Sequence, residues 1–496
     1  MSTSPNRTRL TRRLAAAAVA LVVPGGALLV PSTIAVVAID APRAAALCSL
    51  CAGGEFHPVA PERIFDSRPA NDANPTLPIN DVAPFGVKPV NAVPAGADAV
   101  TFDVDLLGRT GDAGFENPWL PDYVADSDVL AVVVNLIVVS PATKGYAMVF
   151  AAGEDSGQRS SVVNFQAGVT TSNSALVRPG AGGKLTVDLR GTSVSVAHVV
   201  VDVLGWYSTS TYDGDSGAAD DGRGTRSITV TPGRVLDAPA SAVGPASVTT
   251  VPILGARSID ASARVIVPDL ESIEGVIVNL AVAGPTSDTY VSVLPEAPVS
   301  GPPSTSSANV RAGQTRSVMA IVPLGADGAI RLYNNAGNAR LVVDVLGYLE
   351  RRPDESRAGR VIPLVVPFRA FDTRRVEFGR SPLGPGQAEI WSFAAFSNSV
   401  AISSVSVGAQ SGLFGNLTNA SLARQYPTVP VNSNLRVFPA LGPNGAPTIS
   451  QLNSSEAGAV ANMVMLTYGT ASTSYAFNAA GHAHYLLDIS AVILAD

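Results

Sequence analysis

Three arginines and six aspartates recur at matching places in this 496-residue sequence, and their types and spacing could support chemistry. In each of three stretches an arginine precedes an aspartate by three residues, and a further aspartate lies in an apolar run near the end. Paired carboxylates can bind metal or act as acid and base, whereas arginine beside a buried carboxylate forms a structural ion pair. The residues are Arg63, Asp66 and Asp202; Arg234, Asp237 and Asp344; and Arg369, Asp372 and Asp488.

We favour the structural ion pair, because an unpaired carboxylate inside an apolar strand is costly. Three copies of an active site in one chain are unusual, whereas three copies of a structural clasp are expected. His198, Arg340 and His484 share one repeat position, four residues before the closing aspartate and on the same face of a strand. Arginine cannot ligate metal, so this exchange favours charge pairing with the closing aspartate. We expect no metal and no cofactor.

Signatures of catalysis are missing from the sequence. It contains no G-x-S-x-G elbow, no H-E-x-x-H, no P-loop and no G-x-G-x-x-G after a strand. We therefore expect that the protein is not an enzyme. A cell-wall glycan or peptidoglycan hydrolase with an unrecognised site is the alternative.

Aromatic residues gather in an insertion of the first stretch, at about residues 106–128. Aromatic side chains on a Pro- and Gly-containing loop can stack on sugar rings, so Phe115, Trp119 and Tyr123 are candidate ligand contacts. The alternative is that the loop folds back and buries Phe115 and Trp119.

The two cysteines, Cys48 and Cys51, form a C-x-x-C pair. A redox or metal function would need a βαβ context or two further ligands, and neither is present. We favour a local disulfide, which is permitted outside the cell.

These residues belong to an internal repeat of three copies, which is the strongest feature of the sequence. Each copy opens with P-x-R-x-[FL]-D, continued by [ST]-R in the outer copies and by Ala238-Pro239 in the second. Each copy closes with an apolar run around an aspartate, and Ser-x-x-Asn lies between. Asn135 and Asn279 also match, each flanked by Val and Leu.

Short β-branched runs bounded by turn residues fill all three copies, for example 129–139, 275–282 and 289–294. We predict an all-β fold of three tandem antiparallel β-sandwich modules, jelly-roll-like, arranged as separate beads with their own cores. The expected segments are a signal peptide (1–46), the copies (53–208, 226–349 and 360–496), an acidic Gly-rich linker (209–225) and a shorter linker (350–359).

The N-terminus is typical of an export signal, with four arginines before an apolar stretch and small residues near Ala44. Without residues 1–46 about 28 basic and 39 acidic residues remain, which disfavours nucleic acid as a partner. We expect a secreted, extracellular protein that can associate with the cell wall, with no stable membrane span in the mature chain.

The repeat resembles modules of secreted actinobacterial surface proteins, which run P-x-R-[LF]-x-D-T-R, V-x-N-[LV]-x-V, Ser-x-x-Asn and V-V-V-D-V-x-G-[YF]. The resemblance covers most of the chain after the signal and is loosest in the middle of the third copy. It implies export, a β-sandwich and a place on the cell surface, and it assigns no catalytic residue. We expect a non-catalytic surface protein that binds cell-wall or extracellular polysaccharide or protein; a purely structural spacer is the alternative.

Overall fold

The computed structural model describes residues 53–68, 99–107, 119–121, 123–154, 160–191, 197–212, 214, 223–354, 356–394, 409–421, 432–441, 448–454 and 458–495. All of them belong to one compact unit that runs from Ala45 to Asp496. The expected signal peptide, both cysteines and Phe115 lie outside the described residues.

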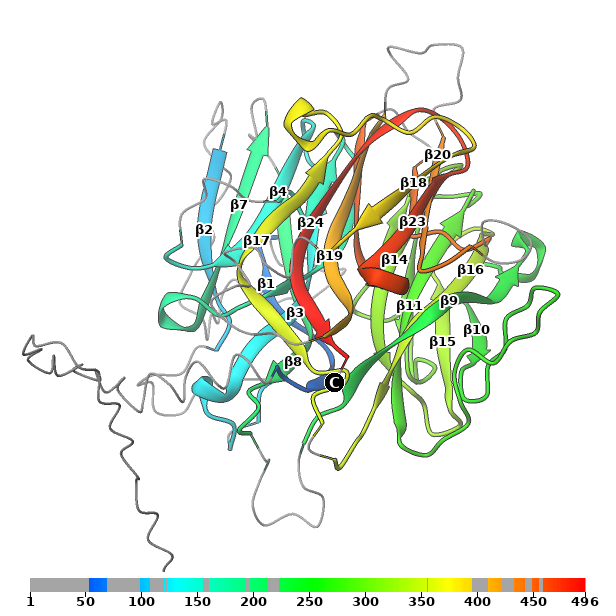
Figure 1. Ribbon diagram of the computed structural model, residues 1–496. Coiled ribbons are helices and arrows are strands. Elements are labelled where there is room, and N and C mark those ends of the chain that lie inside the picture. Colours follow the sequence, from blue (N-terminus) through cyan, green and yellow to red (C-terminus); the bar gives the residue numbers. More distant parts are fainter. Residues whose placement is uncertain are drawn as a thin grey trace, which may run out of the picture. The chain divides into compact units, whose positions relative to one another are not determined.

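The described residues form strands and short 3₁₀ turns, with no α-helix among them (Figure 1). The first copy contains β1 (Phe56–Asp66), β2 (Ala99–Asp105), β3 (Val129–Val139), β4 (Gly145–Ala151), β5 (Val163–Phe165), β6 (Thr171–Val177), β7 (Lys184–Gly191) and β8 (His198–Ser208). The second contains β9 (Arg226–Ala238), β10 (Ser247–Pro252), β11 (Ile273–Ala283), β12 (Thr289–Leu294), β13 (Ala308–Val310), β14 (Thr315–Pro323), β15 (Ala329–Asn334) and β16 (Arg340–Glu350). The third contains β17 (Val361–Asp372), β18 (Gln387–Ser392), β19 (Gln410–Ser421), β20 (Ser433–Phe438), β21 (Leu452–Ser454), β22 (Ala459–Thr467), β23 (Thr473–Asn478) and β24 (Ala483–Leu494). The 3₁₀ turns are η1 (Asp126–Asp128), η2 (Ala181–Gly183), η3 (Ala240–Ala242), η4 (Val376–Phe378) and η6 (Thr470–Ser472).

Each copy is an antiparallel sandwich with the strand order of a jelly roll. In the first copy one sheet has the order β1-β8-β3-β6 and the other β2-β7-β4-β5, as in a long hairpin that is rolled up. The other copies repeat this order, with β9 and β17 in the place of β1. The predicted all-β sandwich fold is confirmed, and the strands predicted at 129–139 and 289–294 have those bounds.

The prediction of separate beads is wrong. Each copy has its own apolar core between its two sheets, but a further buried cluster combines side chains of all three copies. The cluster, which we call the central core, comprises Phe56, Leu130, Ala131, Val133, Leu176, Tyr207, Ile277, Met319, Ile321, Leu346, Leu349, Val361, Phe414, Met463, Met465, Ala491 and Ile493.

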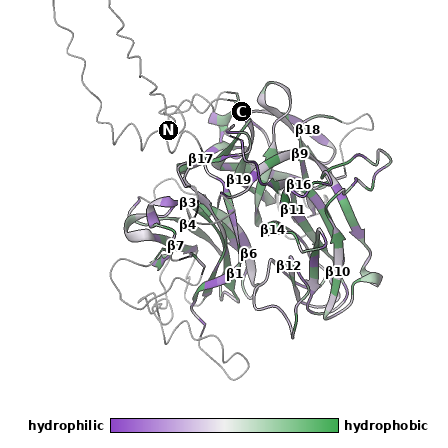
Figure 2. Ribbon diagram, turned by 90° about the horizontal axis from the view of Figure 1, so that it is seen from below, coloured by the Kyte–Doolittle hydropathy of each residue, from purple (hydrophilic) through white to green (hydrophobic). Residues whose placement is uncertain are grey.

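The central core exists because the strands that supply it are apolar on both faces. Strand β3 is buried at every position but its last, and β11 carries buried residues on both faces as well. Figure 2 shows long hydrophobic stretches along β11 and β14. A sheet that is apolar on both sides needs cover on both sides. One face of each such sheet covers the sandwich interior, and the other faces the neighbouring copies.

Backbone pairing also joins the copies. Arg316 of β14 pairs with Ser454 of β21, which links a sheet of the second copy to one of the third. Near the start of the copies, Gly54 bridges Val361 and Phe56 bridges Thr225. The three repeats are therefore packed and hydrogen-bonded into one body.

Candidate functional site: the clasps and the interfaces between copies

The recurring arginine lies against the closing aspartate in every copy, because the first and last strands pair in register at this point. Arg63 is the strand partner of Asp202, and its Nε donates to Oδ1 over 2.8 Å. In the second copy the same distance is 2.8 Å, and in the third it is 2.9 Å. The closing aspartates are Asp202, Asp344 and Asp488, and all are buried. We call each arginine with its two aspartates a clasp.

The opening aspartate of each clasp is held by a second arginine. The guanidinium of Arg68 donates hydrogen bonds to both carboxylate oxygens of Asp66, two residues away. Arg374 does the same to Asp372. The second copy has lost this arginine, and Arg340 of the last strand replaces it with two bonds of 2.7 Å to Asp237.

The repeat position shared by His198, Arg340 and His484 therefore does not pair with the closing aspartate, and that prediction is wrong. Nδ1 of His198 lies 3.3 Å from the Ser67 hydroxyl, and Nδ1 of His484 lies 3.0 Å from that of Thr373. The loss of one arginine and the gain of another in the same copy was a signal in the sequence that could have identified this partner.

The clasps also reach into the neighbouring copy. Arg63 donates to the carbonyl of Ser304 in the second copy over 3.1 Å. Arg234 donates in the same way to the carbonyl of Thr448 in the third copy over 2.6 Å. The clasps of the first and second copies therefore also contact the copy that follows them.

The repeated asparagines close this arrangement into a ring. The amide nitrogen of Asn135 in the first copy donates to the carbonyl of Ser306 in the second over 2.9 Å. Asn279 of the second copy donates to Ser450 of the third over 2.5 Å. Asn416 of the third copy donates to Ser161 of the first over 2.7 Å. The order first to second, second to third and third to first is that of a cyclic trimer within one chain.

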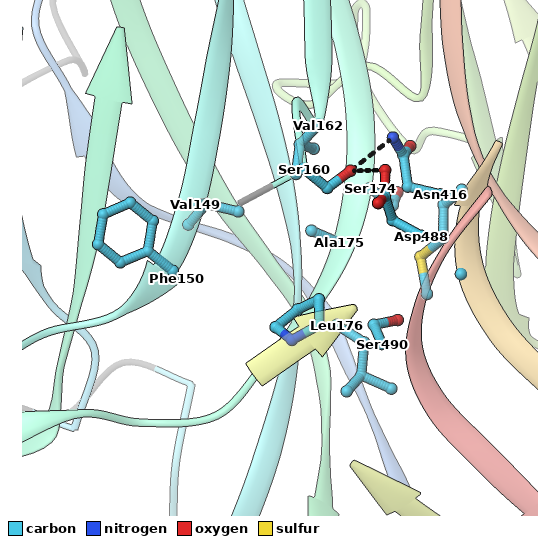
Figure 3. Close-up of a pocket in the computed structure, with 13 residues that line it drawn as sticks. Val149, Phe150, Ser160, Val162, Ser174, Ala175, Leu176, Asn416, Asp488 and Ser490 are labelled. Carbon is cyan, nitrogen blue, oxygen red and sulfur yellow. Dashed lines mark hydrogen bonds between the residues drawn. The ribbon is translucent and has the colours of Figure 1, made fainter. Parts of the chain in front are cut away.

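A small cavity of about 40 Å³ lies at the interface between the third and first copies (Figure 3). Asp488 lines it, and the Ser160 hydroxyl of the first copy donates to its Oδ2 over 2.6 Å. Figure 3 shows Ser160 between Asp488 and Asn416, bonded to both. Both hydrogen bonds connect the first copy to the third beside the cavity.

Burial and ion pairing act in opposite directions on the clasp carboxylates. Burial raises the pKa of Asp202 and of Asp344, although their arginines oppose the shift. Burial also tends to raise the pKa of Asp372, but the bonds and charges of Arg374 and Arg369 bring it down to about 2. Asp372 is therefore a carboxylate at neutral pH, held by hydrogen bonds from Arg374 and Arg369, with Arg375 3.9 Å away.

A buried ion triad not identified from the sequence lies where the copies begin. One oxygen of Glu55 accepts hydrogen bonds from Nε of Arg226 at 3.2 Å and from Nε of Arg360 at 3.1 Å. The strand registers place these three residues at the same position of the three copies. The three residues precede the opening motif of each copy, and one glutamate among two arginines forms no repeated pattern.

The three candidate ligand contacts, Phe115, Trp119 and Tyr123, differ in whether they are described and how exposed they are. Trp119 is buried in the core of the first copy, 4% exposed, so it offers no face to a sugar ring in this structure. Tyr123 is 64% exposed. Phe115 lies outside the described residues. Of the described candidates, Tyr123 alone presents a free aromatic surface.

Within the described part of the chain, no group of three or more His, Cys, Asp or Glu side chains is placed to hold a metal ion. No described helix has the length and apolar character that crossing a membrane requires. The recurring charges form ion pairs and interface contacts.

No protein-family model matches the chain, and no curated protein matches it. Solved structures give weak likenesses. A chain from the atomic structure of Sulfolobus Turreted Icosahedral Virus is 8% identical, with 89% of this chain and 92% of that chain covered and a TM-score of 0.16. A chain described under the triple jelly roll fold and turret assembly in an archaeal virus is 8% identical, with coverages of 88% and 90% and a TM-score of 0.15. The N-terminal CBM22-1-CBM22-2 tandem domain of Xyn10C from Paenibacillus barcinonensis is 10% identical, with coverages of 59% and 98% and a TM-score of 0.16. Such TM-scores carry no argument about function.

Proposed function

We propose that this chain is an exported, non-catalytic surface protein, and that it presents three fused β-sandwiches as one rigid scaffold for binding cell-wall or extracellular polysaccharide. The observation that carries the proposal is that the recurring polar residues bond to other parts of the protein. Clasp arginines, asparagines and serines engage one another within and between copies. Such residues support architecture, so ligand contacts belong to loops that differ between the copies.

Tyr123 is the first residue to test in such a loop. It belongs to the insertion that distinguishes the first copy, and 64% of its surface is exposed. An exposed aromatic ring is a suitable stacking surface for a sugar, so a polysaccharide is the first ligand class to test. A spacer without a specific ligand is the second candidate, since the same interlocked copies would serve it equally.

Binding of the purified protein from residue 47 onward to isolated cell wall tests the proposal. We expect the protein to sediment with wall polysaccharide, and we expect Tyr123→Ala to weaken this binding severalfold because the stacking surface is lost. The control is Tyr146→Ala, which removes a tyrosine that is 38% exposed on β4, outside the insertion.

Two results would contradict the proposal in different ways. Absence of binding to any wall fraction would leave the spacer function. Release of reducing sugars or free amino groups from the same wall material would identify a hydrolase instead.

A further inference from the structure

The interface between the first and second copies differs from the other two at the closing aspartate. In the second copy, Oδ2 of Asp344 accepts a hydrogen bond from the backbone N–H of Ser450 over 3.0 Å. In the third copy, Oδ2 of Asp488 accepts one from the hydroxyl of Ser160. Oδ2 of Asp202 has no hydrogen-bond partner among the described residues, although the residue is 0% exposed.

The unpaired oxygen belongs to a residue that lines a cavity between the two copies. This cavity measures about 20 Å³, which is roughly the room that one water molecule or one small ion needs. Its oxygen-bearing lining residues are Asp202, Asn135, Ser174, Thr305, Ser306 and Ser307. A buried carboxylate oxygen without a partner is costly, so the cavity favours an occupant that stabilises negative charge.

Charge also distinguishes this interface. Among the described residues, the group around Asp202 contains three acids and two arginines: Glu62, Asp66, Asp202, Arg63 and Arg68. Glu62 is close enough for the Asp202 charge to raise its pKa, after the larger effect of burial. Within this described group the acidic residues therefore outnumber the arginines by one.

The interface between the second and third copies receives an additional cation from the protein itself. Arg436 of β20 lies within electrostatic range of Asp344 and Arg234 across the interface. The strand registers place Ser292 of the second copy at the position of Arg436. Asp344 therefore has a nearby guanidinium from the next copy, whereas the described part of the second copy has the neutral Ser292 at the equivalent position.

We propose that the cavity between the first and second copies binds one small hard metal cation, of the alkali or alkaline-earth class, with Oδ2 of Asp202 as its anionic ligand. Hydroxyl, carbonyl and amide oxygens of the lining residues complete an oxygen shell, which is the ligand set that such ions prefer. The charge of Glu62, which interacts with that of Asp202, adds to the negative potential at the cavity. The ion supplies the positive charge that Arg436 supplies at the next interface. Such a site departs from the expectation, based on the sequence, that the protein holds no metal.

Thermal unfolding of the whole protein in different salts tests the site. Metal-free protein is measured in choline chloride, whose cation is too large for the cavity, and then with NaCl, KCl or CaCl₂ at constant ionic strength. We expect at least one metal ion to raise the melting temperature saturably, by about 2 °C or more, because it binds the folded state alone. Equal melting temperatures in all four salts would show that the cavity holds water only, and would overturn the proposal.

Variants separate the site from general salt effects. Among the described residues Glu62 makes no ion pair within hydrogen-bonding distance, so Glu62→Gln should fold normally and require a severalfold higher ion concentration. Asp202→Asn should lose the response, whereas Asp344→Asn, at the equivalent place in the second copy, should keep it. If Asp202→Asn does not fold, Glu62→Gln decides. An unchanged ion response in Glu62→Gln would then refute the site.

Discussion

At the scale of single residues, the clasp aspartates are stabilised by arginines that cannot be removed without leaving a buried charge. Arg234 donates to both oxygens of Asp344, which is 0% exposed. We expect Arg234→Ala to lower the free energy of unfolding by about 3–5 kcal/mol, as for other broken buried pairs. Chemical denaturation followed by circular dichroism measures this change.

An exposed ion pair supplies the control for that measurement. Arg375 lies 3.5 Å from Glu377, with both side chains about 60% exposed. Glu377→Ala breaks this pair and leaves the second contact of Arg375, with Asp372 at 3.9 Å, in place, so it should change the free energy of unfolding by no more than about 1 kcal/mol. Equal effects of the two substitutions would mean that the clasp contributes nothing beyond a surface pair.

His57 should make the protein sensitive to mild acid. Its ring stacks on Trp206 at 4.1 Å, and burial, with a smaller effect of Arg351, lowers its pKa from 6.5 to about 4. The folded state therefore binds this proton less readily than the unfolded chain. Stability from the neutral ring is complete above pH 6.5 and is lost as the pH falls to about 4, by at most about 3 kcal/mol.

Melting temperatures between pH 4 and pH 7 check this expectation. His57→Phe keeps an aromatic ring against Trp206 but cannot take up a proton, so its melting temperature should depend less on pH in this window. Acid sensitivity that is identical in the variant would assign the effect to other groups. Asp372 titrates with a pKa of about 2, so its contribution is lost only at lower pH.

At the scale of elements, the sequence predicted the strands well and their partners poorly. The run Val129–Val139 is β-branched and bounded by turn residues, which determines a strand through local preference. The same run is apolar at successive positions rather than at every second one, and this was the available sign that both faces of its sheet are covered. Which surface covers the second face depends on contacts between residues more than 100 positions apart, such as Asn135 with Ser306, and no local pattern encodes them.

The clasps show the same limit. Repetition identified every arginine and aspartate that takes part, and the apolar setting of the closing aspartates favoured an ion pair. The contacts of Arg63 and Arg234 with the next copy could not be derived, because they involve backbone carbonyls, which carry no residue-type signal. The exchange in the second copy, which lacks the second arginine of the opening motif and has Arg340 instead, was visible in the sequence and could have identified Asp237 as the partner of Arg340.

At the scale of the whole molecule, the described parts of the three copies behave as a cyclic trimer whose subunits share one chain. A ring of asparagine contacts and the central core join every copy to the other two. Covalent linkage between the copies should therefore not be needed once the chain has folded. A protease site inserted between residues 215 and 220, followed by cleavage, separates the first copy from the rest of the chain covalently.

We expect the two fragments to stay together on size-exclusion chromatography and to unfold in a single transition. The buried central core should keep the two fragments associated at the concentrations used, because stable interfaces between subunits bury large apolar areas. Phe414→Ala in the cleaved protein provides the sensitive comparison, because it removes a fully buried side chain of the central core and costs about 3–5 kcal/mol. The substitution should promote dissociation of the cleaved fragments while the uncut variant stays whole. Fragments of the unsubstituted protein that elute apart would show that the copies are independent beads after all.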